Sequence, residues 1–324
     1  MTLSVRFRLN ETKKLSKKKS RKTFLNKRQD RVLRRLFLHQ ARSAGHVATQ
    51  PSSDRVFRVD CHVHTYFSDG SATVKQVEEV CRNLNIGCCI TDHNEIRGSL
   101  ILLERMKVPT VASIEIGSRE QIELLVFFRY AQHAEDFFKQ HIEPVRRNRR
   151  FSILPLSLDY LLEAASDYDT LIALPHPFAP FWKNIQYGKK RRNAIMRTLN
   201  RVDCIEVYNG TATHRANRKS LALCHVLGGI PLAGSDSHTV KTIGTAGIDF
   251  FHPVTSDNLF DSIKNDEIFR IYEHASRHRH VSNTYHLALN HSKNIVMRQE
   301  HSSQVWRKFI LYKRRTSRVI PKIL

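Results

Sequence analysis

Histidines and acidic residues follow short apolar segments at five places in this sequence. The first place is the run DCHVHTYFSDG at residues 60–70, in which two histidines are separated by one residue. Side chains two positions apart in an extended segment point to the same side, so an H-x-H pair can offer two imidazoles to one metal ion. The other places are ITDHN, SIE, LPHP and GSDSH. Together they supply the candidate metal ligands His62, His64, Asp69, His93, Glu115, His176, Asp236 and His238.

The apolar segments before these residues are typical of short strands. They span residues 56–61, 86–91, 109–115, 122–128, 171–174, 202–207 and 230–233. Continuous apolar runs, without strict alternation, favour parallel strands that are covered on both faces. Helical patterns lie between them: Thr73 and Gln76 form a capping-box pattern, and residues 216–227 end at Gly228. Alternating strands and helices predict an α/β barrel or a doubly wound sheet.

In an α/β barrel the loops that follow the strands form the active site, so all eight candidate ligands would share one rim. A mixture of imidazoles and carboxylates suits Zn, Mn or Fe better than Ca or Mg alone. Eight ligands exceed what one tetrahedral ion needs, and two or three metal ions are therefore expected, with Glu115 or Asp236 as a bridge. Each motif alone also has an ordinary structural explanation, such as a helix cap or a turn. Their coincidence at five strand ends favours the metal site.

The same motifs resemble those of the PHP (polymerase and histidinol phosphatase) superfamily, in the same order and over residues 56–269. The segments concerned are DCHVHTYFSDG, ITDHN, IEI, LPHP, EVYNG and GSDSH. The SDG and EVYNG variants look most like small stand-alone bacterial members, which are metal-dependent phosphoesterases acting on nucleotides or 5′→3′ exonucleases acting on short oligonucleotides. The resemblance implies a distorted (β/α)7 barrel with a trinuclear metal centre.

The resemblance also assigns ligands to the three metal positions. His62, His64, Glu115 and Asp236 would hold the first ion, whereas Asp69, His93 and His238 would hold the second. Glu115 and His176 would contribute to the third. The family usually has another histidine on the strand after the glutamate, and here Glu123 occupies that place.

The expected chemistry is hydrolysis by a hydroxide that lies between two cations, which lower the pKa of bound water. His176 or His238 could protonate the leaving oxygen if it is not fully committed to metal. Asn209 and Asn217 could position the substrate or simply form Asx turns. Lys190 and Arg192, in the run KKRR, could contact phosphates or belong to a solvated loop.

Charge is concentrated at the two ends of the chain. The net charge is +23, of which residues 1–54 carry +12, residues 271–324 carry +9 and the middle only +2. We predict a disordered basic arm at 1–54, the phosphoesterase domain at 55–270 and a basic extension at 271–324. Such ends attract polyanions, either nucleic acid or an anionic membrane.

The apolar content of 41% excludes a wholly disordered chain. The sequence has no apolar run of ~20 residues, and its six cysteines form no CxxC pair; from its first residues we expect no signal peptide. A cytoplasmic enzyme is expected, which hydrolyses phosphate esters of nucleotides or short oligonucleotides. The alternatives are a histidinol-phosphate-type phosphatase of small metabolites, and an inactive scaffold that binds nucleic acid or membranes.

Overall fold

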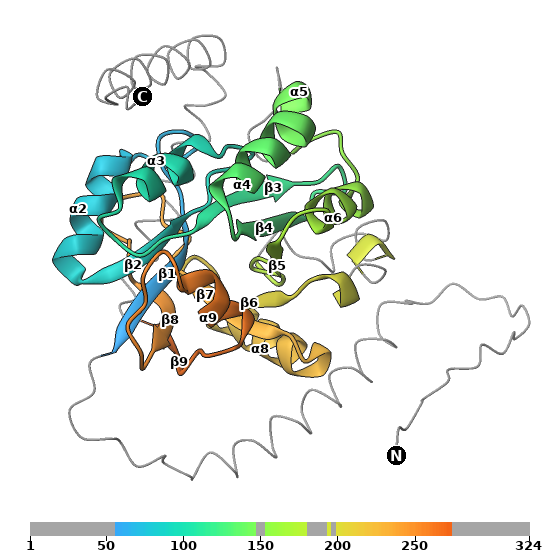
Figure 1. Ribbon diagram of the computed structural model, residues 1–324. Helices are drawn as coiled ribbons and strands as arrows, with labels where there is room; N and C mark the ends of the chain where they lie inside the picture. The colour runs from blue at the N-terminus through green and yellow to red at the C-terminus, as the bar shows by residue number, and fades with distance from the viewer. Residues whose placement is uncertain (1–55, 147–152, 180–192, 196–198, 274–324) are drawn as a thin grey trace, which may run out of the picture. The chain divides into compact units, whose positions relative to one another are not determined.

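The computed structural model describes residues 56–146, 153–179, 193–195 and 199–273 (Figure 1). They all belong to one compact unit, Ser52–Leu324. The strands are β1 (Phe57–Val63), β2 (Ile86–Ile90), β3 (Ala112–Gly117), β4 (Glu123–Phe128), β5 (Thr170–Leu174), β6 (Cys204–Asn209), β7 (Ile230–Gly234), β8 (Ala246–Phe250) and β9 (Arg270–Glu273). All seven predicted strands are therefore present.

The strands form two sheets, with the orders β2-β1-β8-β9 and β3-β4-β5-β6-β7. Only the pairs β1–β2, β5–β6 and β6–β7 are parallel. The prediction of parallel strands is wrong for β4, which runs antiparallel to both β3 and β5. Single parallel bridges link the two sheets: Val63 of β1 pairs with Ser237, which follows β7, and Glu115 of β3 pairs with His93, which follows β2. The mixed α/β architecture is confirmed, but the described residues do not form the closed, continuous barrel that was expected.

Strand β4 shows why an apolar run does not reveal strand direction. Leu124, Val126 and Phe128 pack into a core shared with helices α4 (Ala131–Phe137) and α6 (Leu158–Ser166). Leu125 and Phe127 point the other way, into a core to which strands of both sheets contribute. Both faces are covered, so every residue is buried whether the neighbouring strand is parallel or antiparallel.

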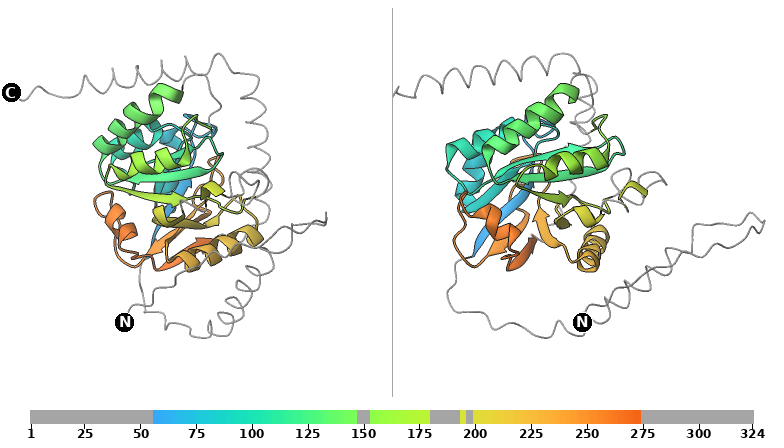
Figure 2. Two further views of the ribbon diagram at one scale, coloured as in Figure 1. Left: turned by 90° about the vertical axis from the view of Figure 1, so that its right-hand side faces the viewer. Right: turned by 45° about the vertical axis from the view of Figure 1, so that its right-hand side comes forward.

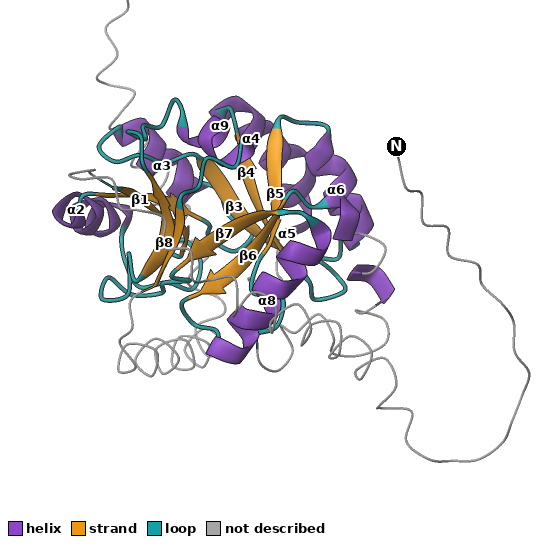
Figure 3. Cartoon of the chain, turned by 90° about the horizontal axis from the view of Figure 1, so that it is seen from below, coloured by secondary structure: helices purple, strands orange, loops and turns teal. Residues whose placement is uncertain are grey.

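Helices surround the strands (Figure 3). Besides α4 and α6, the described helices are α2 (Val74–Leu84), α3 (Arg97–Arg105), α5 (Glu143–Arg146), α8 (His214–Leu227) and α9 (Leu259–Lys264). A π-helical turn spans Phe138–Ile142, and a 3-10 turn spans Leu199–Arg201. In Figure 2 the green helices α4–α6 and the yellow-orange helix α8 lie on opposite sides of the strands. The capping box of Thr73 with Gln76 is confirmed, and α8 ends at Gly228 in the left-handed conformation, as predicted. Among the described helices, none is both long and apolar enough to cross a bilayer.

Strands β8 and β9 were not predicted. A buried acid interrupts the apolar pattern of β8: Asp249 forms ion pairs with Arg58 of β1 and Arg270 of β9. These partners are distant in sequence, so a local pattern gives no sign that this aspartate is compensated. Strand β9 crosses the boundary predicted at residue 270. The arm at 1–54 and positions Lys190 and Arg192 lie outside the described residues, as does the extension beyond residue 273.

Candidate metal centre

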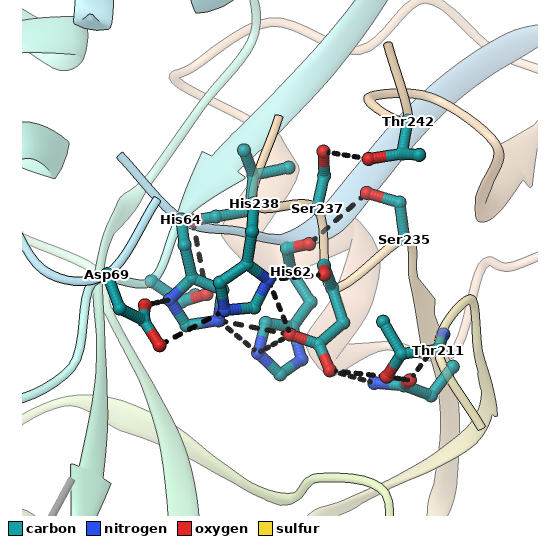
Figure 4. Close-up of polar contacts among 12 residues, drawn as sticks. His62, His64, Asp69, Thr211, Ser235, Ser237, His238 and Thr242 are labelled. Carbon is teal, nitrogen blue, oxygen red and sulfur yellow. Dashed lines mark hydrogen bonds and ion pairs between the residues drawn. The ribbon is translucent and has the colours of Figure 1, made fainter. Parts of the chain in front are cut away.

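Nine acidic and histidine side chains from six chain segments meet at one edge of the strands. His62 lies in β1, and His64 and Asp69 follow it; His93 follows β2; Glu115 lies in β3; Glu123 begins β4; His176 follows β5; Asp236 and His238 follow β7. We call these nine residues the ligand cluster. Figure 4 shows His62, His64, Asp69 and His238 pointing toward one another.

The ligand cluster divides into four overlapping groups whose donor atoms lie within 4.8 Å of one another. They are His64, Asp69, His93 and His238; His62, His64 and Asp236; His62, Glu115 and His176; and His93, Glu115 and Glu123. The structure thus brings together every metal ligand predicted from the sequence, Glu123 included. The first group adds His64 to the trio expected at the second metal position. Asp69 and Glu123 have the most exposed side chains of the nine, at 13% and 8%.

The donor spacing fits divalent cations. Glu115 Oε2 lies 3.0 Å from His93 Nδ1 and 3.4 Å from Nε2 of both His62 and His64, yet it accepts no hydrogen bond of acceptable geometry. His62 Nε2 and His64 Nε2 face each other at 3.0 Å. Bonds of ~2.1 Å to a tetrahedral ion separate neighbouring ligands by about 3.4 Å. Buried nitrogen and oxygen atoms at this spacing fit metal coordination.

Glu206 orients His62 but was not predicted as a functional residue. Glu206 Oε1 lies 3.0 Å from His62 Nδ1, so the charged carboxylate favours a proton on Nδ1 and directs the Nε2 lone pair into the ligand cluster. Glu206 Oε2 accepts from the backbone N–H of His176 at 2.7 Å. An acid within the run Cys204–Tyr208 of β6, whose other residues are apolar, was the available sequence signal.

Asn209 and Thr211 hold Asp236 from the side opposite the histidines. The Asn209 amide donates to Asp236 Oδ2 at 3.3 Å and to Glu206 Oε2 at 3.0 Å, and the Thr211 hydroxyl lies 2.8 Å from Asp236 Oδ2. Asp236 Oδ1 lies 3.2 Å from His64 Nε2. The Asn217 amide donates to the backbone carbonyl of Asn209. Both asparagines are buried, and Asn209 Oδ1 accepts from the backbone N–H groups of Thr211 and Ala212, so Asn209 forms the Asx turn that was one of the two expectations.

Backbone geometry around the ligand cluster departs from the common conformations. Asn94, His176 and Asp236 have φ values of 50°, 29° and 50°, in the region that favours glycine. Asp92 ties down the loop after β1 by accepting from the Thr65 N–H at 2.6 Å and from the Ser68 hydroxyl at 2.7 Å. Such strain persists where surrounding contacts over-determine it, as is common at functional sites.

Opposite charges dominate the electrostatics of the ligand cluster. Burial lowers the pKa of His62, but the carboxylates of Glu206, Asp236 and Glu115 outweigh it and hold that pKa well above its usual value. Burial, together with the charge of His238, lowers the pKa of His64 to about 3. The carboxylates of the cluster therefore favour positive charge at His62, and a bound cation can supply that charge in place of the proton.

We expect Glu206→Gln to weaken metal binding by about 10–100-fold, because an uncharged amide makes the His62 imidazole a weaker donor. Competition with a metal-binding dye measures this, with Glu163→Gln on the exposed face of α6 as the matched control. Parental affinity in Glu206→Gln would show that Glu206 does not tune the site.

Comparisons with known proteins give a family match for part of the chain and a likeness of fold. A family model described as PHP-associated matches residues 214–268, which include Asp236 and His238. The match confirms the resemblance to the PHP superfamily over these residues. No curated protein gives a significant match to the sequence.

Solved structures give the fold likeness. The lesion-specific endonuclease Q from Pyrococcus furiosus is 18% identical, with a TM-score of 0.51 over 67% of this chain and 58% of that one. Endonuclease Q bound to a 27-mer duplex with an abasic lesion at its active site is 16% identical, with a TM-score of 0.52 over 65% and 57%. A candidate metal-dependent phosphoesterase from Bifidobacterium adolescentis is 16% identical, with a TM-score of 0.46 over 67% and 98%. At these identities the likeness concerns the fold alone.

Proposed function

We propose that this chain is a hydrolase of phosphate esters in nucleotides or short oligonucleotides and depends on divalent metal ions. One observation carries the proposal: five histidines and four carboxylates converge with the spacing of metal ligands. When bound, the cations would supply an activated water and neutralise charge on the phosphate oxygens. Zn, Mn and Fe suit this donor set.

The protein's own groups would orient and polarise this centre. Glu206 directs His62, and Asn209 with Thr211 aims one oxygen of Asp236 at the histidines. His238 Nδ1 lies 2.9 Å from the Asp236 carbonyl, which leaves its Nε2 facing Asp69 at 3.3 Å. This arrangement favours His238 as a ligand. Proton transfer to the leaving oxygen by His238 or His176 is a further proposal and requires an Nε2 that is not bound to metal.

Two observations support nucleotide or nucleic-acid substrates. The net charge of +23 favours polyanions, and endonuclease Q, whose fold is similar, binds a DNA duplex at its active site. The site at which a phosphate would arrive is lined by Asp69 and Glu123, so cations are needed to offset their charge.

The test is a substrate panel on metal-loaded protein, with phosphate release and product length as readouts. It comprises a mononucleotide, a 5′-phosphorylated dinucleotide, a longer oligonucleotide and histidinol phosphate. We expect turnover of at least one of the first three. Hydrolysis of histidinol phosphate alone would identify the small-metabolite phosphatase. Binding of the oligonucleotide without hydrolysis of any compound would identify an inactive scaffold.

Deleting residues 1–54 is expected to weaken binding of a labelled single-stranded oligonucleotide and to flatten its salt dependence. The arm carries a net charge of +12. The slope of log K against log salt is negative, and each lost phosphate contact makes it less steep by about 0.7. Fluorescence anisotropy at several salt concentrations measures both quantities. A truncated chain with the full-length slope would show that the polyanion contact lies elsewhere.

A further inference from the structure

We infer that Glu123 gives one metal position of the ligand cluster a hard oxygen donor and lets the ion bound there exchange more readily. With Glu123, this position prefers Zn²⁺ over Mn²⁺ less strongly than it would with a histidine. The position is the one bounded by His93, Glu115 and Glu123, and His176 Nε2 lies beside it, 3.5 Å from Glu123 Oε2. The inference rests on the proposed metal-dependent function, which it deepens, but its test reads metal binding directly.

The β3–β4 hairpin explains how Glu123 reaches the ligand cluster. Gly117, the last residue of β3, pairs with Glu123, the first residue of β4. Glu115 lies two residues before Gly117 and so shares its face of the sheet, which makes Glu115 and Glu123 diagonal neighbours. Because Gly117 has no side chain, nothing opposite Glu123 on that face separates its carboxylate from Glu115.

Distances confirm that the Glu123 carboxylate belongs to this position. Its Oε2 lies 3.5 Å from His176 Nε2, and its Oε1 lies 3.9 Å from His93 Nδ1. Glu115 Oε1 lies 3.1 Å from the same His176 nitrogen. The group of His93, Glu115 and Glu123 therefore has two carboxylates and one imidazole, whereas the group of His64, Asp69, His93 and His238 has three imidazoles and one carboxylate.

This difference in donors predicts a difference in selectivity. Imidazole nitrogen suits Zn, Cu and Fe, whereas carboxylate oxygen suits Mg, Ca and Mn. The position with two carboxylates is thus the hardest donor set in the cluster. Zn²⁺ can still bind at this position, because most sites have a higher affinity for Zn²⁺ than for Mn²⁺. The expected effect is therefore a smaller preference for Zn²⁺.

Charge also favours a carboxylate here. Three dications would bring six positive charges to the ligand cluster, which supplies four carboxylates; a histidine at position 123 would leave three. Cations in multi-metal sites lie only about 3.5–4 Å apart, where their repulsion in a buried site is strong. Glu123 therefore offsets part of the cost of adding the last ion. Its side chain is more exposed than that of every other cluster member except Asp69, which favours exchange with solvent at this position.

The test compares the full-length protein with Glu123→His, the isosteric Glu123→Gln and the control Glu163→His, an exposed exchange on α6. Each metal-free protein is titrated with Mn²⁺, followed by electron paramagnetic resonance, and with Zn²⁺ in competition with a chelating dye. We expect the ratio of the Mn²⁺ to the Zn²⁺ dissociation constant at the weakest site to rise at least about 10-fold in Glu123→His. In Glu123→Gln, Mn²⁺ binding should weaken at least about 10-fold, because a charged ligand is lost. The control should keep both parental constants.

Parental constants in both Glu123 variants would overturn the inference. Circular dichroism of the metal-free proteins checks folding, and Glu123→Gln, which preserves shape, decides the matter if Glu123→His does not fold. Failure of the proposed function looks different: the parent would show the expected selectivity and yet hydrolyse none of the panel. Failure of the inference alone would leave hydrolysis intact while the Glu123 variants bind both metals as the parent does.

Discussion

Replacing Asp236 with asparagine is expected to lower kcat/KM for phosphoester hydrolysis by at least about 10³-fold, because a metal centre contributes several kcal/mol of charge stabilisation. Asp236 Oδ1 faces His64 Nε2 at 3.2 Å, where a shared cation would lie. The amide oxygen of asparagine can still accept from Asn209 and Thr211, but its NH2 group would face the histidines and cannot bind a cation. Steady-state kinetics of the metal-loaded proteins measure the effect.

Two controls separate lost chemistry from lost structure in this variant. Asp257→Asn changes an exposed aspartate that does not belong to the ligand cluster, and this variant should keep parental turnover. The circular dichroism spectrum of Asp236→Asn should match that of the parent. Unchanged turnover in Asp236→Asn would defeat the assignment of this carboxylate to the catalytic centre.

Removal of metal by a chelator should abolish hydrolysis and lower the thermal stability of the protein. A ligand at 1,000 times its dissociation constant stabilises the folded state by about 4 kcal/mol per site. For a domain of 150–250 residues, each kcal/mol shifts Tm by about 2–4 °C. A single filled site thus predicts a loss of roughly 8–16 °C, which calorimetry measures with and without chelator.

Restoring the metal provides the control for this prediction. Adding Mn²⁺ or Zn²⁺ in excess over the chelator should recover both Tm and turnover, because the buried carboxylates again have cations to neutralise them. Adding Na⁺ at the same ionic strength should recover neither. A Tm that does not respond to the chelator would show that the ligand cluster binds no stabilising cation.

The amino-acid sequence determined those features that depend on neighbours in the chain. The pairing of His62 with His64 follows from extended backbone geometry, and the capping box at Thr73 and the glycine end at Gly228 are local hydrogen-bonding patterns. The positions of the other candidate ligands after apolar runs could be read in the same way, whereas Glu123 came only from the resemblance to the PHP superfamily; the structure brings all nine together.

Tertiary structure decided what depends on contacts between distant segments. The antiparallel direction of β4 was hidden because both its faces are buried, and strand β8 was missed because Asp249 is neutralised by Arg58, 191 positions away. Likewise, the role of Glu206 emerges only from its contact with His62, 144 residues earlier. The spacing of side chains along the chain indicates which residues share one face of a strand or helix. Strand pairing determines which of these faces meet. Only strand pairing therefore places a carboxylate beside a particular imidazole.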